Sequence, residues 1–403
     1  IDFTNVLSKN MDKQLLLELS SFQSELVEIL QDIHSHPELS MQEKRTSKLI
    51  ADKLREYDIT VTENVGRTGV VGTLESTNSG DESIGLRADI DALGLTEKTD
   101  LAYSSTVPGV MHACGHDGHT VMLLGAAKYL SKHRDSFRGT VYFIFQPGEE
   151  KLEGALAMIN DKLFERFPMR AVYGLHNLSQ GDVGKFHIRP GSMMAASDRW
   201  YVTFRGSGGY GGANPHLTTD LTVVQAQFIL ALQTVVSRNI AAADSAVISV
   251  GAIQGGSFNG LNIMPSEVRI GGTARSFTKS VRNTIERRIR ELAHGLAESF
   301  GCVTQVEYYR FGVPLINHET ETSKAIKAAG LLVGEENVNG HASALTAAED
   351  FAYMLEEKPG AYIILANGSK HGPVHSPTYV FNPECIPFGI GYWIKLVQLE
   401  LKP

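Results

Sequence analysis

The feature that most constrains the fold is a β-α-β-β-α-β pattern that interrupts a longer alternation of helices and strands. The pattern consists, in chain order, of a strand at 199–204, a helix at 221–237, strands at 246–253 and 266–273, a helix at 281–300 and a strand at 304–309. This order is typical of the split βαβ unit of ferredoxin-like domains. Because the unit is complete in itself, we expect it to form a domain inserted within another one.

Outside this segment, predicted helices alternate with short β-rich runs. The predicted helices are 15–33, 43–54, 119–131, 155–164, 320–332, 349–355 and 390–399, and the predicted strands are 59–62, 69–74, 83–88, 140–145, 170–174 and 361–365. Such alternation favours an α/β sheet covered by helices on both faces. A chain of 403 residues is long enough for two cores. We therefore predict an α/β domain formed by 1–192 and 312–403 and an inserted α+β domain formed by 193–311.

The overall charge and the cysteines limit the choice of partners and compartment. The net charge is -8 and Lys and Arg form no block, so nucleic acid is not an expected partner. Cys114, Cys302 and Cys385 are too few and too widely spaced for a disulfide framework, which favours a reducing, cytoplasmic setting. We see no signal peptide and no apolar run that approaches the roughly 20 residues of a membrane span, so no membrane partner is expected.

The densest chemical signal is the segment MHACGHDGHT at 111–120, just before a predicted helix. It places one thiol, three imidazoles and a carboxylate within eight positions. Thiolate and imidazole are strong ligands for zinc and related metals. A single His in this place would more often cap the helix, and a Cys would more often pack as a small apolar group. For the whole cluster, a metal site is the better interpretation.

Three further segments carry candidate ligands. QPGEE at 146–150 and YGLHN at 173–177 each follow an apolar strand, where ligand sites form in α/β sheets. HGPVHSP at 371–377 lies in a predicted loop. An exposed Glu pair or a lone loop His is common on any surface, so each segment is informative only together with the others. Asp89, in RADIDAL at 87–93, is placed to orient a ligating His, although a turn cap is an equal alternative.

Together these segments supply enough candidate ligands for two metal ions that share them. Two cations lower the pKa of a water so that hydroxide is available near neutral pH. A free carboxylate then takes the proton from the water and delivers it to the leaving nitrogen. We assign this role to Glu149 and assign Glu150 as a ligand.

These motifs resemble those of the M20 metallopeptidase and aminoacylase group. Within it, HACGHDGH, QPGEE, GLHN and HSP resemble the amidohydrolase branch of hippurate hydrolases, auxin-conjugate hydrolases and N-acetyl-diaminopimelate deacetylases. The resemblance covers nearly the whole chain. It implies a zinc-peptidase-like catalytic domain with an inserted ferredoxin-like lid or dimerisation domain. It also implies that Glu149 is the general base and that the ligands of two metals are Cys114, His116, Glu150, His176 and His375.

In the inserted domain, the resemblance implies that Asn262, Arg275 and His216 contact substrate. A guanidinium such as that of Arg275 is well shaped to hold a carboxylate, although a surface salt bridge is the alternative. One residue departs from the family pattern, because Tyr210 in GGYGG stands where the family has a His that steadies the oxyanion. Three interpretations are open: Tyr210 donates the same hydrogen bond, the activity is weak, or the Tyr is an introduced change.

We predict metal-dependent hydrolysis of the amide bond of N-acyl amino acids or similar small conjugates. The alternatives are a dipeptidase or carboxypeptidase that uses the same site, and a non-catalytic binding homologue, which Tyr210 alone suggests. The metals expected are two Zn²⁺ or Mn²⁺ per subunit, with Co²⁺ or Ni²⁺ as further candidates. A homodimer formed through the inserted domain is the expected assembly.

Overall fold

The computed structural model describes residues 11–179 and 181–403, and these form two compact units. Unit 1 contains the chain up to Met193, 316–343 and 350–403, and unit 2 contains 194–315 and 344–349. The predicted boundaries differ from these by one residue at the first crossing and by four at the second. The prediction also left 344–349 in the first domain. This segment groups with unit 2 because the backbone amide of Ala195 donates to the carbonyls of Leu345 and Ala347.

Unit 1 is built on an eight-stranded sheet with the order β1-β2-β4-β3-β5-β16-β6-β15. The strands are β1 (Thr60–Val65), β2 (Gly69–Glu75), β3 (Asn78–Asp89), β4 (Arg138–Gln146), β5 (Ala171–Leu178), β6 (Phe186–His187), β15 (Val338–Asn339) and β16 (Gly360–Ala366). The central strands β4, β3, β5 and β16 run parallel. Their carboxyl ends therefore meet at one edge of the sheet, which is where ligand sites form in α/β folds.

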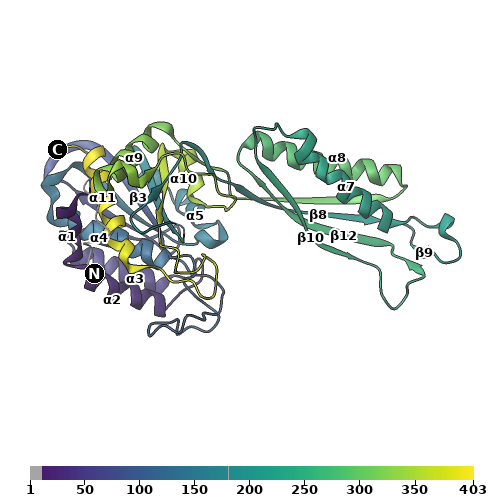
Figure 1. Cartoon of the computed structure of the whole chain (residues 1–403), viewed down its shortest axis with the longest axis horizontal. Coiled ribbons are helices and arrows are strands. Elements are labelled where there is room, and N and C mark those ends of the chain that lie inside the picture. Colours follow the sequence, from purple (N-terminus) through teal and green to yellow (C-terminus); the bar gives the residue numbers. More distant parts are fainter. Residues whose placement is uncertain (1–10, 180) are drawn as a thin grey trace. The chain divides into compact units, whose positions relative to one another are not determined.

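Helices cover both faces of this sheet, which confirms the predicted α/β class (Figure 1). One face carries α1 (Lys13–Ser20), α2 (Gln23–Ser35), α3 (Lys44–Glu56), α4 (His116–Lys132), α9 (Glu319–Val333) and α11 (Ile386–Glu400). The other carries α5 (Gly154–Asn160), α6 (Leu163–Arg166) and α10 (Phe351–Glu357). Helix α4 is buried along most of its length between the sheet and its neighbouring helices, so its first turn is held firmly at the sheet edge.

Two predicted helices are each divided in the structure. The helix expected over 15–33 is interrupted between α1 and α2, where the hydroxyls of Ser20 and Ser21 donate to the carbonyls of Leu16 and Glu18. Serine hydroxyls that bond to the backbone in this way compete with the helix. The helix expected over 155–164 is likewise split into α5 and α6 by Lys162, which has a positive φ of 62°.

Unit 2 has an antiparallel sheet with the order β10-β12-β8-β13. Its strands are β8 (Ala196–Arg205), β10 (Ala246–Gly255), β12 (Glu267–Ser276) and β13 (Val303–Phe311), and its helices are α7 (Leu221–Asn239) and α8 (Lys279–Ser299). Both helices pack on the same face of the sheet (Figure 1). The chain order β8-α7-β10-β12-α8-β13 confirms the predicted ferredoxin-like insert.

Short paired strands complete the structure. In unit 2, β9 (Gly209–Tyr210) pairs with β11 (Ile263–Met264). The pair β7 (Gly191–Met194) and β14 (Leu315–Asn317) lies where the chain passes between the units. The pattern of apolar residues predicted none of these strands, because runs of two to four residues are too short to show a period.

Helix α7 is the one helix among the described residues that is long and apolar enough, by length and composition, to cross a membrane. It has 19 residues and a mean hydropathy of 1.2, so the expectation that no apolar run approaches this length was wrong. Part of its apolar surface serves to pack the unit, because Val224, Phe228 and Leu232 are buried in the core of unit 2.

Candidate metal centre

The segment before α4 makes a turn that only glycine allows. Gly115 has a φ of 87°, which side-chain-bearing residues rarely adopt. A Cβ at this position would lie 2.3 Å from Oδ1 of Asn177 and 2.5 Å from the hydroxyl of Tyr379. The tight turn places Cys114 just before the helix and His116 at its first position. Helix α4 therefore begins at His116, three residues earlier than predicted.

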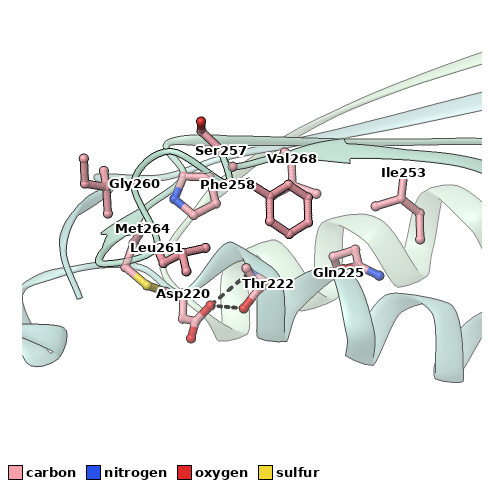
Figure 2. A pocket seen from close by; sticks show the side chains of 14 residues that line it. Asp220, Thr222, Gln225, Ile253, Ser257, Phe258, Gly260, Leu261, Met264 and Val268 are labelled. Carbon is pink, nitrogen blue, oxygen red and sulfur yellow. Dashed lines mark hydrogen bonds between the residues drawn. The ribbon is translucent and has the colours of Figure 1, made fainter. Parts of the chain in front are cut away.

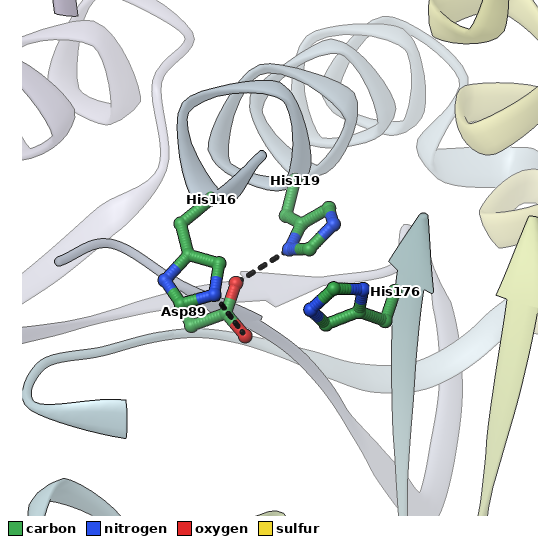
Figure 3. Close-up of side chains that lie close together, drawn as sticks. All are labelled: Asp89, His116, His119 and His176. Atoms are coloured by element: carbon green, nitrogen blue, oxygen red, sulfur yellow. Dashed lines mark hydrogen bonds and ion pairs between the residues drawn. The ribbon is translucent and has the colours of Figure 1, made fainter. Parts of the chain in front are cut away.

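The structure brings the five predicted ligands together at the carboxyl edge of the central strands. Sγ of Cys114 lies 3.3 Å from Nε2 of His176, which is on β5. Nε2 of His116 lies 3.9 Å from Oε1 of Glu150, and Oε2 of Glu150 lies 3.5 Å from Nε2 of His375. One atom each from Cys114, His116 and Glu150 lies within 4.8 Å of the others. The arrangement of His116 and His176 around the start of α4 and the end of β5 is visible in Figure 3.

Two buried atoms in this cluster have no hydrogen-bond partner among the residues that the structure describes. They are Nε2 of His116 and Oε1 of Glu150, which lie 3.9 Å apart. A buried polar atom without a partner costs free energy, so such atoms are rare unless they bind something. A nitrogen lone pair, a carboxylate oxygen and a nearby thiol are together a donor set suited to zinc or a related divalent cation. The residues present therefore fit the predicted metals.

The pKa values of two predicted ligands bear on how they could bind a cation. Burial, together with the nearby His119, holds the pKa of His176 well below its usual value, so its imidazole is neutral and can donate a lone pair. Burial raises the pKa of the Cys114 thiol, and the Glu150 carboxylate adds to this effect. A thiolate at this position needs a positive charge beside it, which a metal ion would supply.

His116 is oriented by Asp91, a residue of the RADIDAL segment for which no role was predicted. Nδ1 of His116 lies 3.0 Å from the carbonyl oxygen of Asp91 and 3.2 Å from its Oδ1. This contact turns Nε2 of the same ring toward the cluster. The other oxygen, Oδ2, accepts from the hydroxyl of Ser40 at 2.6 Å and from the amide of Glu150 at 3.0 Å. The repeated acid in the segment Asp89-Ile90-Asp91 was the signal that could have found it.

Asp89 was expected to orient a ligating His, and the structure pairs it with His119 instead. Its Oδ1 lies 2.6 Å from Nδ1 of His119, whereas its Oδ2 is 3.7 Å from Nε2 of His116 (Figure 3). Nε2 of His119 lies 2.7 Å from Oδ1 of Asn177. The backbone amide of Asn177 donates to the same nitrogen at 3.0 Å, so the lone pair of His119 is used within the protein and this imidazole connects β3, α4 and β5. Arg87 balances the charge of Asp89 at 2.8 Å.

Glu149, the predicted base, lies in the short turn that follows β4. The turn depends on Gly148, which has a φ of 65°, and it directs both acids of the pair toward α4. Oε2 of Glu149 lies 4.0 Å from Nε2 of His116, and the residue is only 6% exposed. A carboxylate so close to the ligand cluster is within reach of a water bound there, by direct contact or through one further water.

Comparison with known proteins identifies the family. The family model described as Peptidase family M20/M25/M40 matches residues 85–399 of this chain. The chain belongs to peptidase family M20.

This M20 chain is similar over nearly its full length to a hydrolase and a deacetylase. It is 40% identical to a hippurate hydrolase of Campylobacter jejuni, over 96% of this chain and 100% of the relative. It is 33% identical to an N-acetylcysteine deacetylase of Bacillus subtilis, over 95% of this chain and 98% of the relative. A Bacillus subtilis crystal structure, described as a dinuclear metal binding peptidase from the M20 family, superposes with a TM-score of 0.83 at 30% identity, covering 95% of this chain and 99% of that one. These findings confirm the predicted M20 amidohydrolase and support divalent metals.

The predicted substrate contacts of the M20 chain all belong to unit 2. Tyr210 pairs with Ile263 across β9 and β11, and its side chain is 55% exposed. The carbonyl of Asn262 accepts from the amide of Gly212, so Asn262 and Tyr210 share this hairpin. His216 follows in an exposed turn, while Arg275 lies near the far end of β12. The structure thus brings Tyr210 and Asn262 together and leaves Arg275 apart from them.

A cavity of about 470 Å³ also lies in unit 2 of the M20 chain, between the start of α7 and the loop at 256–261 (Figure 2). Phe258 and Leu261 line it and are 96% and 83% exposed. The acid at its floor, Asp220, caps α7 by accepting from the amides of Thr222 and Val223. Among the described residues that line it there is no His or Cys, so this cavity lacks the donors of the metal centre.

Proposed function

We propose that this M20 amidohydrolase hydrolyses the amide bond of N-acyl amino acids or similar small conjugates, with Glu149 as general base. The observation that carries the proposal is the buried cluster of Cys114, His116 and Glu150, beside which the Glu149 carboxylate lies 4.0 Å from His116. His176 and His375 complete a five-ligand set for two divalent cations. Zinc or manganese suits these ligands, and cobalt or nickel is also compatible with them.

When bound, the metals would supply Lewis acidity, which lowers the pKa of water and polarises a carbonyl. Glu149 then accepts a proton from the attacking water at a carboxylate oxygen while the water oxygen bonds to the amide carbon. The tetrahedral intermediate breaks at the C–N bond as Glu149 delivers that proton to the leaving nitrogen. The products are a carboxylic acid and a free amino acid, and Glu149 returns to its starting charge.

Residues of unit 2 are proposed to recognise the substrate. Arg275 is half-buried, and its guanidinium donates to the carbonyl of Ala274, which leaves further N–H groups for a substrate carboxylate. We assign Asn262 and His216 to the same task. Tyr210 is proposed to steady the oxyanion through its hydroxyl, a hydrogen-bond donor but not a cationic one. The hydrolase and deacetylase names of the relatives support an N-acyl amino acid as substrate.

The proposal is tested by hydrolysis of N-acetyl, N-benzoyl and indole-acetyl amino acids beside unblocked dipeptides, with added zinc or manganese. Release of free amino acid from the acylated set that stops with a chelator is the expected result. Turnover of dipeptides alone would show that the chain is a dipeptidase and not an acylase. A chain that binds two metals and turns over neither set would be a non-catalytic homologue.

We further propose a homodimer formed through strand β10 of unit 2. This strand is at one edge of its sheet, is ten residues long and carries no charged residue or proline. Such an edge is prone to pair with another chain, whereas the opposite edge, β13, carries Glu307 and Arg310. Val247 and Ile253 on β10 are 40% and 54% exposed, and Leu230 on α7 is 66% exposed. A second copy of this surface would bury them.

The remaining expectations concern location and other partners. We propose a cytoplasmic location, which the three free cysteines support, and cell fractionation with an antibody would test it. We propose no nucleic-acid or membrane partner. Vesicle and DNA binding at physiological salt are the corresponding measurements.

A further inference from the structure

His34 lies at the end of α2, buried between two carboxylates. Its Nδ1 is 2.7 Å from Oδ2 of Asp117, and its Nε2 is 3.2 Å from Oε1 of Glu97. The side chains of all three residues are at most 5% exposed. None of them belongs to the proposed ligand set or to the general base, so the proposed reaction does not explain why this group is buried.

Each carboxylate holds a different segment of the metal centre. Asp117 directly follows His116, and its Oδ1 accepts from the amide of Gly118 at 2.9 Å, within the first turn of α4. Glu97 accepts from the amide of Ser105 at 2.6 Å, which closes the loop at 97–105. His34 therefore links this loop to the helix turn that presents His116.

The same loop also supports the segment of His375. The amide of Lys98, next to Glu97, donates to the carbonyl of Pro377 at 2.8 Å. His375 needs such support, because its φ of 63° is unfavourable for a residue with a side chain and the side chain is 55% exposed. Its own amide donates to the carbonyl of Ala113 at 2.7 Å, which also attaches this segment to the centre.

The charges in this group favour a fixed geometry. Burial alone would lower the pKa of His34, but the hydrogen bonds to Asp117 and Glu97 outweigh it and raise the pKa to about 10. The imidazole is therefore a cation that donates from both ring nitrogens. Charge-assisted hydrogen bonds between buried groups are strong and directional, and removing the central cation leaves two buried carboxylates unpaired.

We propose that His34 is a positioning residue of the metal centre. Through Asp117 and Glu97 it fixes the segments of His116 and His375 relative to each other. The inference rests on the proposed ligand set. It predicts that His34 affects how tightly metal is bound, although its hydrogen bonds are to Asp117 and Glu97, which are not proposed ligands. Groups that orient metal ligands in this indirect way typically change metal affinity by about 10- to 100-fold when they are removed.

The test measures zinc and manganese dissociation constants of the full chain by competition with a chelator, for the wild type, His34→Gln and Glu97→Gln. His133→Gln is the matched control, because His133 caps the end of α4, the helix that carries Asp117, but is 39% exposed and contacts the carbonyl of Tyr129. We expect each of the first two substitutions to weaken metal binding about 10-fold or more and the control to leave it unchanged. An unchanged dissociation constant in folded His34→Gln would overturn the inference.

Two further measurements separate positioning from general stability. Urea unfolding of the metal-free proteins reports stability alone, and a loss of stability with normal metal affinity would also overturn the inference. If His34→Gln does not fold, Glu97→Gln decides in its place. Where both variants fold, their combination should weaken metal binding little more than either alone, because the two residues act through one contact. The proposed function fails separately, if the wild type binds metal but hydrolyses no amide.

Discussion

Asp91 contacts His116 and orients its imidazole ring within the candidate metal centre. Nδ1 of His116 lies 3.0 Å from the backbone oxygen of Asp91 and 3.2 Å from its carboxylate, and Nε2 of the ring has no hydrogen-bond partner within residues 11–179 and 181–403. Because the same carboxylate accepts from the amide of Glu150, one acid orients two predicted ligands that lie 34 positions apart in the sequence. One carboxylate therefore fixes the orientation of both residues relative to each other.

Replacing Asp91 by Asn should lower metal affinity by about 10- to 100-fold, because an amide cannot accept at both positions that the carboxylate serves. The measurement is the metal dissociation constant of the purified chain by chelator competition. Asp81→Asn, on an exposed stretch of β3, is the control and should bind metal normally. Equal affinities in the two variants would show that Asp91 does not orient His116.

Glu149→Gln should keep both metals and reduce kcat by about 10²- to 10⁴-fold, the usual contribution of a general base. The amide has the shape of the carboxylate but cannot take a proton. Metal content by elemental analysis and kcat on an N-acyl amino acid are measured on the same sample. Glu153→Gln, an exposed acid four residues on, should keep full activity. If Glu149→Gln loses metal and regains a normal rate on reconstitution, Glu149 is a ligand and not the base.

Tyr210→His should raise the rate of hydrolysis, since an imidazolium stabilises a developing oxyanion better than a phenol does. Tyr210→Phe removes only the hydroxyl and should lower the rate if that hydroxyl donates to the oxyanion. Both variants should fold, because the side chain is 55% exposed. The decisive comparison is kcat/KM of the three proteins on one substrate. A fall in both variants would show that the Tyr hydroxyl has its own role in this branch.

His34 should make the stability of the metal-free chain depend on pH in the alkaline range. Its pKa is raised to about 10 in the folded state, where Asp117, Glu97, Tyr103 and His112 surround it. A raised pKa stabilises the fold below the unfolded value near 6.5, and this contribution is lost as the pH rises toward 10. The difference in unfolding free energy between the wild type and His34→Gln should therefore shrink from pH 6.5 to 10. A difference that stays constant or grows would mean that His34 is neutral in the fold.

Charges placed on the β10 edge should disrupt the proposed dimer. We expect Val247→Lys with Ile253→Lys to convert the chain to monomers, because like charges from two copies would then meet at an apolar contact. Val303→Lys on β13, the opposite edge, is the control, since Val303 is similarly exposed at 65%. Light scattering after size-exclusion chromatography gives the mass. A wild-type monomer, or a dimer that only the β13 change disrupts, would contradict the assignment.

The sequence by itself determined the fold class, the ferredoxin-like insert, the family and the residues grouped as ligands. These depend on local order: strands and helices alternate along the chain, and thiol, imidazole and carboxylate groups follow the strand ends. Parallel strands bring their carboxyl ends to one edge, so Glu150 on the turn after β4 and His176 on β5 had to approach the start of α4.

Only the tertiary structure decided which acid orients which imidazole. Asp89 and Asp91 are two positions apart in one motif, and the sequence pattern favoured Asp89. The fold directs Asp89 to His119 and Asp91 to His116. It also joins His34, Glu97 and Asp117 from three distant segments. Such pairings depend on side-chain direction and distances of a few ångströms, which packing fixes and a one-dimensional pattern does not record.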